Sequence, residues 1–170
     1  MKKEDILRKR AQLISRERTI KDDSRKEIEV LDFVLCGERY AFETKFIKEV
    51  FVTYDVIKVP SSPAFLFGVV NYRGLILPII DLRVIFGISC RDNDEKSKLI
   101  IISCDEFVTS IIVDKIGLVQ KIKEDSIDTN IPTLSSYPEG YVRGISKGNI
   151  VILEAKAFID DKSLIINESV

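Results

Sequence analysis

The sequence contains no histidine among its 170 residues. Histidine is the commonest general base and metal ligand, so its absence excludes Ser-His and Cys-His catalysis and phosphotransfer onto histidine within this chain. The glycine-rich loops GxxxxGK[ST] and GxGxxG, which bind phosphate groups, are also missing. Asp81, Asp105, Asp114 and Asp128 lack the spacing of a calcium loop, and we interpret them as turn or surface residues. We therefore predict no catalytic residue, cofactor or metal site.

Long apolar runs and a basic charge excess are lacking as well. No window approaches the roughly 20 apolar residues of a membrane helix, and the charged N-terminus lacks the apolar core of a signal peptide. The net charge of -1 and pI near 5.7 provide no field that would attract nucleic acid. The one basic run, Lys2 to Arg18, is interpreted as a solvated helix face. We expect a cytoplasmic protein without nucleic-acid binding or direct membrane insertion.

Cysteine is scarce. The three cysteines, Cys36, Cys90 and Cys104, are odd in number and have no CxxC spacing. This pattern suggests neither a disulfide framework nor a zinc site. We predict reduced thiols, with Cys36 and Cys104 as small residues at the ends of apolar strands.

The remaining composition, 45% hydrophobic and 31% charged, is that of an ordinary folded protein. The length suits one core or two small lobes that share a core. Residues 1–29 are predicted to form an amphipathic helix, Lys3 to Arg18, and a linker. Residues 30–160 form the folded domain, and residues 161–170 form a tail.

From Val30 onward, short apolar runs alternate with turn residues at the spacing of an all-β domain. Gly37-Glu38 is predicted to form a type II′ hairpin turn. Thr44 is expected to cap a short helix that carries Phe46, Ile47 and Val50 on one face. Further strands are expected at residues 56–59, 65–70, 75–82, 99–103, 107–113, 118–122, 141–145 and 150–153.

Asn71, Arg73 and Gly74 form a tight turn between two very apolar strands. One interpretation is a hairpin with a surface arginine. The other is an interface anchor, because the guanidinium makes several directed hydrogen bonds while its stem packs. The residues alone leave both open.

Around this turn the sequence resembles the CheW domain family. The similarity is carried by the following segments: Tyr40-Ala41-Phe42, Ile47-Lys48-Glu49-Val50, Pro60, Pro63, Gly68-Val69-Val70-Asn71-Tyr72-Arg73-Gly74, Pro78 and Asp81-Leu82-Arg83. A looser similarity includes Val113 to Gly117 and Tyr141 to Ile145. The usual Asn-Leu-Arg-Gly is Asn-Tyr-Arg-Gly here, and the closing LLD is replaced by Leu153-Glu154-Ala155.

The resemblance implies an all-β fold of two five-stranded β-barrel lobes around a shared core. The first lobe is expected at about 42–90 and the second at about 98–153, with terminal strands able to cross between them. It also implies a non-enzymatic adaptor whose partners are the regulatory domain of the histidine kinase CheA and the cytoplasmic tip of methyl-accepting chemoreceptors. The motif positions associated with the receptor or kinase interface are Ile47, Glu49, Val50, Val56, Gly68, Asn71 and Arg73.

Such an adaptor would be cytoplasmic and recruited to membrane-associated receptor arrays. An alternative is an adaptor or lattice scaffold of a non-flagellar chemosensory pathway that controls motility or gene regulation. A small β-barrel enzyme or nucleic-acid binder is disfavoured by the missing histidine, phosphate loop and basic field.

Overall fold

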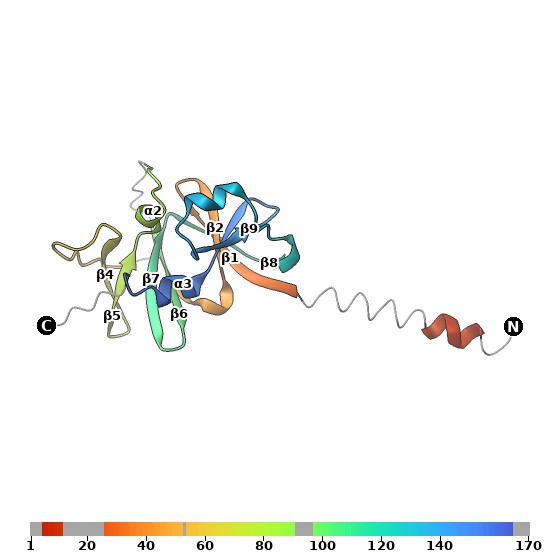
Figure 1. Ribbon diagram of the computed structural model, residues 1–170. Coiled ribbons are helices and arrows are strands. Elements are labelled where there is room, and N and C mark those ends of the chain that lie inside the picture. Colours follow the sequence, from red (N-terminus) through yellow and green to blue (C-terminus); the bar gives the residue numbers. More distant parts are fainter. Residues whose placement is uncertain (1–4, 12–25, 53, 91–96, 165–170) are drawn as a thin grey trace.

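The computed structural model describes residues 5–11, 26–52, 54–90 and 97–164 (Figure 1). The strands are β1 (Glu27–Leu35), β2 (Glu38–Glu43), β3 (Ile47–Phe51), β4 (Leu66–Tyr72), β5 (Leu75–Ile80), β6 (Lys98–Cys104), β7 (Phe107–Val113), β8 (Lys115–Lys123), β9 (Val142–Ile145) and β10 (Ile150–Leu153). The helices that accompany them are α2 (Leu82–Ile85), α3 (Ala155–Asp160) and the 3-10 turns η2 (Thr44–Phe46), η3 (Glu124–Ser126) and η4 (Pro132–Ser136). None of the described helices is long and apolar enough to span a membrane.

The strands form two five-stranded sheets. In sheet A the order is β8-β1-β2-β10-β9, and in sheet B it is β3-β6-β7-β5-β4. Most neighbours are antiparallel, but β10 pairs with β2 and β5 pairs with β7 in parallel. The predicted all-β fold with two five-stranded units is confirmed.

The sheets divide the chain at different positions from the expected lobe boundaries. Strands β6 and β7, placed by sequence in the second lobe, pair with β3 and β5 in sheet B. Strands β1 and β2 join β8 and β10 in sheet A. The chain therefore starts in sheet A, builds sheet B, and returns to complete sheet A.

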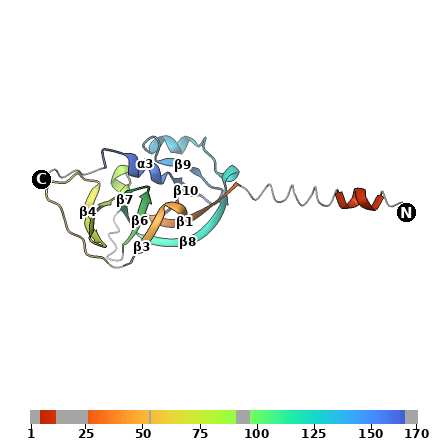
Figure 2. The ribbon, with the colours of Figure 1, turned by 90° about the horizontal axis from the view of Figure 1, so that it is seen from below.

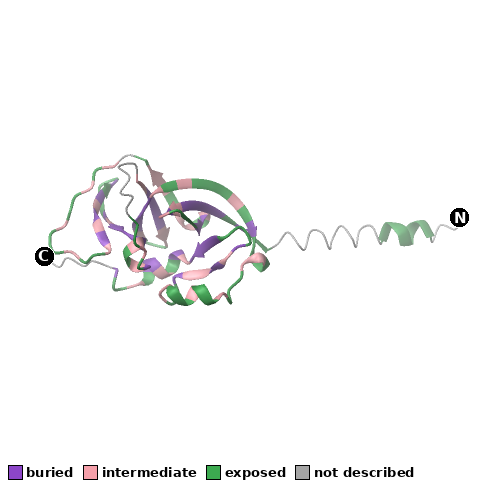
Figure 3. Cartoon of the chain, turned by 90° about the horizontal axis from the view of Figure 1, so that it is seen from above, coloured by how far each residue is buried: buried purple, intermediate pink, exposed green. Residues whose placement is uncertain are grey.

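Strands that are buried on both faces connect the two sheets (Figure 3). In β6, Ile100 and Ile102 belong to a large shared core, whereas Leu99 and Ile101 belong to a second cluster inside sheet B. In β10 the same alternation separates the shared core from a third cluster inside sheet A. Alternate side chains of a strand point to opposite faces, so continuous apolar runs suit this arrangement. The shared core predicted from the sequence is present.

Helix α3 packs over the junction between the sheets (Figure 2). The Phe158 ring lies 5.8 Å from the Phe42 ring of sheet A and 4.4 Å from the Tyr141 ring, measured between centroids. This helix was not predicted from the sequence. Phe158 and Ile159 of this helix are buried and Lys156 is exposed, so the helix is amphipathic. Because it has only six residues, the pattern is too short to be recognised in the sequence.

Three local predictions were wrong. The expected helix after Thr44 is a single 3-10 turn, after which residues 47–51 form strand β3 paired with β6. The first hairpin turns at Cys36 and Gly37, whose φ angles of 52° and 82° are both positive, which is the pattern of a type I′ turn rather than type II′. The strand expected at 56–59 is reduced to an isolated bridge between Ile57 and Val69.

The N-terminal segment is helical over residues 5–11, and the rest of the predicted helix lies outside the described residues. All seven of these residues are exposed, including the apolar Ile6 and Leu7. The helix therefore does not pack on the described part of the body.

Candidate functional site

The turn between β4 and β5 places Arg73 at the tip of a rigid hairpin. Arg73 and Gly74 have φ angles of 50° and 86°, again the type I′ pattern. The Asn71 Oδ1 accepts a hydrogen bond of 2.9 Å from the Gly74 amide and closes the turn. Glycine adopts such φ angles freely, whereas an arginine does so at a cost of about 1 kcal/mol. The turn itself therefore does not explain why arginine stands at this position.

The Arg73 guanidinium forms an ion pair with Glu49 of β3, at 2.9 Å between Nη2 and Oε2. The arginine side chain is 71% exposed and the glutamate side chain 32%. The guanidinium also lies 5.3 Å from the centre of the Tyr72 ring. Exposed ion pairs contribute at most about 1 kcal/mol to stability. This pair orients a charged group at the surface more than it stabilises the fold.

Sheet B brings Glu49 and Arg73 together although β3 and β4 are its opposite edges. The sheet curls until side chains of the two edges meet, and the Phe51 and Tyr72 rings lie 5.6 Å apart. The predicted interface residues Glu49, Asn71 and Arg73 therefore share one end of sheet B.

Apolar side chains are exposed on β5 and beside β4, the strands of the hairpin that carries Arg73. Ile57 pairs with Val69 and Ile76 pairs with Asn71, and paired residues point to the same face of a sheet. Ile57 is 58% exposed and Ile76 is 59% exposed. These two residues form what we call the β4–β5 face, while Leu75, which is also exposed, pairs with Tyr72 on the other side of the hairpin. Sequence reasoning did not select these residues, because exposed and buried aliphatic residues look alike within an apolar strand.

Gly68 allows a neighbouring segment to approach β4 closely. A Cβ atom at this position would lie 2.6 Å from the Val56 Cγ1 and 2.8 Å from the Ile57 carbonyl oxygen. The same segment is held by two hydrogen bonds between the backbones of Ile57 and Val69, at 2.8 and 2.9 Å. The structure thus brings the predicted residues Val56 and Gly68 close together at β4.

Ile47 and Val50 have a different environment. Both are half-buried on β3 and pack against the shared core. Their role in the structure is to attach β3, and with it Glu49, to the body.

Two lysines that were not selected from the sequence lie against aromatic rings of β4. The Lys58 Nζ lies 3.3 Å from the centre of the Phe67 ring and donates a hydrogen bond of 2.6 Å to the Phe67 carbonyl. The Lys48 Nζ lies 6.0 Å from the centre of the Tyr72 ring. These contacts add positive charge around an apolar surface, a composition common in protein interfaces.

A second arginine of the resemblance, Arg83, has a structural environment. Its side chain is 11% exposed and donates to both Asp81 oxygens, at 2.8 and 2.9 Å, and to Asp114 at 3.3 Å. Hydrogen bonding to Asp81 raises the pKa of Arg83 against the opposing effect of burial. Asp81 also caps α2 by accepting from the Arg83 amide. Asp81 and Asp114 are therefore ion-pair partners at the junction of the sheets, which corrects their interpretation as turn or surface residues.

The prediction of reduced thiols was wrong for two of the cysteines. Cys36 and Cys90 form a disulfide, with 5.6 Å between their Cα atoms and a sequence separation of 54. Cys104 is free and half-buried, as expected. Sequence spacing could not reveal the pair because the contact depends on how the sheets meet. The two sulfurs and an Asp114 oxygen lie within 4.8 Å of one another, but the bonded sulfurs are not metal ligands.

Sheet A carries a further charged group around Arg143. Its guanidinium donates to Glu43 at 2.8 Å and to Glu124 at 2.6 Å. Lys45 lies 2.6 Å from the other Glu43 oxygen. This group joins β2, η3 and β9. Its members are all charged, so it lacks the exposed aliphatic side chains of the β4–β5 face.

Comparison with known proteins adds to this geometry. The family model for the CheW-like domain matches residues 29–163. Similar proteins include chemotaxis protein CheW of Thermotoga maritima, 36% identical over 64% of this chain and 72% of the relative. Chemotaxis protein CheW of Helicobacter pylori is 25% identical over 75% of this chain and 77% of the relative. The crystal structure of the scaffolding protein TtCheW from Thermoanaerobacter tengcongensis superposes with a TM-score of 0.69 and 29% identity, covering 79% of this chain and 94% of that one.

Proposed function

The chain belongs to the CheW-like domain family, and we propose that it is a non-enzymatic chemotaxis adaptor that couples methyl-accepting chemoreceptors to the histidine kinase CheA. The similar proteins are named for chemotaxis and scaffolding, which supports an adaptor within that process. The absence of histidine and of phosphate-binding loops removes the usual means of catalysis. We place the protein in the cytoplasm, recruited to receptor arrays at the membrane.

The observation that carries this proposal is the exposed Arg73–Glu49 pair at the tip of the hairpin whose strands carry the β4–β5 face. Arginine is enriched at interface centres, and the hairpin that presents Arg73 also exposes apolar side chains. The apolar surface would supply affinity, and the two charges would fix register and exclude wrong partners. The energetic cost of arginine in the left-handed conformation supports selection for contact rather than for folding.

An adaptor of this kind works through geometry. The shared core and the strands buried on both faces make the two sheets one stiff body. A stiff body that holds two partners transmits a small displacement of one to the other, provided that each partner binds the two signalling states with different affinity. Many linked copies in an array would raise the effective strength of modest contacts.

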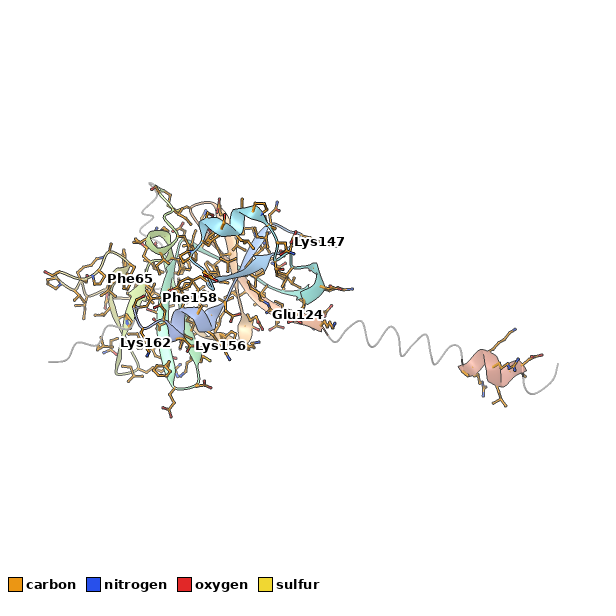
Figure 4. All side chains as sticks on the ribbon, viewed as in Figure 1. Phe65, Glu124, Lys147, Lys156, Phe158 and Lys162 are labelled. Carbon is orange, nitrogen blue, oxygen red and sulfur yellow. A yellow bond between two sulfur atoms is a disulfide. The ribbon has the colours of Figure 1, made fainter. Side chains whose placement is uncertain are left out.

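The test is a titration of the purified protein into the regulatory domain of CheA and, separately, into a chemoreceptor cytoplasmic fragment, both from the same organism. We compare wild type with Arg73→Ala and use Lys156→Ala as the control, because Lys156 is an exposed cation on α3, remote in sequence from the candidate site (Figure 4). Loss of Arg73 should weaken at least one interaction by about tenfold or more, since interface arginines contribute over 1 kcal/mol. Its effect on stability should stay within about 1 kcal/mol.

The possible results separate function from site. Binding of both partners by wild type, with selective loss in Arg73→Ala, supports both. Binding of both partners by Arg73→Ala with unchanged affinity refutes the site and leaves the coupling function standing. If wild type binds neither partner, coupling of receptors to CheA is refuted, and a lattice role or a different chemosensory pathway takes its place.

A further inference from the structure

We propose that Cys36 and Cys90 are a redox modification site, a reversible disulfide that locks sheet A to the segment that follows sheet B. Cys36 lies in the β1–β2 turn of sheet A. Cys90 follows α2, which itself follows β5 of sheet B. The two segments lie side by side at one edge of the molecule (Figure 1), and the disulfide joins positions 54 residues apart.

Cys36 is held in place by contacts that do not depend on the disulfide. Its backbone amide donates to the Asp114 Oδ2 at 2.7 Å. The Asp114 amide donates in turn to the Val34 carbonyl at 3.0 Å, and the Arg83 guanidinium lies 3.3 Å from the Asp114 Oδ1. Because Arg83 belongs to α2, this chain of contacts also fixes the start of the segment that carries Cys90. The thiols are therefore brought close together by the fold, which raises their effective concentration for each other.

Access to solvent makes exchange feasible. Cys90 is exposed and Cys36 is half-buried, so the disulfide is not enclosed in a core. Disulfides that persist in reducing compartments are usually redox-sensing or catalytic, whereas enclosed structural ones resist reduction. That the protein lies in a reducing compartment rests on the proposed function, whereas the redox chemistry of the Cys36–Cys90 pair does not depend on it.

The reaction is a thiol–disulfide exchange with a small disulfide such as oxidised glutathione. The Cys90 thiolate attacks one sulfur of the reagent, forms a mixed disulfide and releases one small thiolate, which takes up a proton. The Cys36 thiolate then attacks the Cys90 sulfur, forms the protein disulfide and releases the second small thiolate. The protein loses two electrons and two protons, and the reagent gains them. Excess reduced thiol reverses both steps.

The consequence is a change in how firmly the sheets are connected. In the reduced state the junction is held by the shared core and by the Arg83 ion pairs. In the oxidised state a covalent bond is added at its edge. Since the bond closes a long loop, the oxidised protein should unfold at a temperature higher by roughly 10 °C.

The experiment uses the full chain carrying Cys104→Ser, so that Cys36 and Cys90 are the only thiols. The protein is equilibrated in glutathione buffers from fully reduced to fully oxidised, quenched with maleimide, and weighed by mass spectrometry. Melting temperatures are recorded for both end states. Cys90→Ser in the same background is the matched control, since it retains Cys36 and every contact of Asp114.

We expect maleimide to label both thiols in reduced buffer and neither in oxidised buffer. Labelling should return when the oxidised protein is transferred back to reduced buffer, and the control should show no shift in melting temperature. Persistent labelling of both thiols in oxidised glutathione would overturn the proposal. So would a disulfide that excess reduced glutathione leaves intact in the folded protein, because the pair would then be a permanent brace. Micromolar zinc chloride is added in a separate arm, and protection of both thiols together with blocked oxidation would assign the cluster to a metal instead. These readouts involve no partner, so they stand or fall independently of CheA and receptor binding.

Discussion

Replacing Arg83 by methionine should destabilise the protein by about 3–5 kcal/mol, the range for breaking a buried ion pair. The Arg83, Asp81 and Asp114 side chains are 11%, 12% and 15% exposed, so all three charges are largely removed from water. Methionine fills much of the volume but leaves two carboxylates without their counter-charge. Small domains are stable by about 5–15 kcal/mol, so the loss is a large share of the total.

The assay is urea unfolding followed by circular dichroism, with Arg73→Met as the control. Arg73 has one exposed ion-pair partner, and its replacement should change the free energy of unfolding by no more than about 1 kcal/mol. In the Arg83→Met background, Asp114→Asn should restore part of the loss, because it removes one uncompensated charge and keeps an acceptor for the Cys36 amide. Equal effects of the two arginine replacements, or a loss below about 1 kcal/mol at Arg83, would refute this account of the junction.

Three further changes test the packing and the burial of polar groups. Gly68→Ala should lower the free energy of unfolding by about 1–3 kcal/mol because its Cβ would clash with the facing backbone, whereas Gly148→Ala, with its nearest atoms at 3.9 and 4.0 Å, should change it far less in urea titrations. Thr109→Val should leave stability unchanged or increase it by up to about 1 kcal/mol in thermal melts, since the buried hydroxyl has no hydrogen-bond partner among the described residues. A decrease in stability would show that the hydroxyl does have a partner. Burial raises the pKa of Tyr40 and of Tyr141, so the neutral hydroxyls contribute stability below pH 10 that is lost as the pH rises further, by about 1.4 kcal/mol per pH unit for each tyrosine. Replacing both by phenylalanine should flatten urea midpoints measured from pH 9 to 11, and an unchanged slope would contradict the assignment.

Much of the fold was predictable because each strand carries its own apolar run and its own turn residues. The segment 99–103 is a clear case, since continuous burial on both faces leaves an uninterrupted aliphatic sequence. Strand β3 was not predictable from local signals. Thr44 is a good capping residue and the apolar spacing after it suits a helix, but pairing with β6 along Glu49 to Phe51 determines the structure. Tertiary contacts overrode the local preference.

The candidate site was predictable in its residues and not in its geometry. The family resemblance named Glu49 and Arg73, which are 24 residues apart. Their contact requires sheet B to curl until its opposite edges meet, and no local pattern encodes that. The Cys36–Cys90 pair was missed for the same reason, because it forms where two sheets join.

The two arginines of the family motif are separated by ten positions, and sequence similarity treats them alike. Their surroundings assign them different tasks. Arg83 needs the planar fork of the guanidinium, since it bonds both oxygens of one carboxylate and reaches a second. Lysine at this position would keep the charge but lose that geometry, so Arg83→Lys should destabilise the fold. Arg73 makes one exposed ion pair, and Arg73→Lys should fold normally. If Arg73→Lys also retains partner binding, the interface depends on charge at the hairpin tip; if binding is lost while stability is kept, the partner contacts the guanidinium itself.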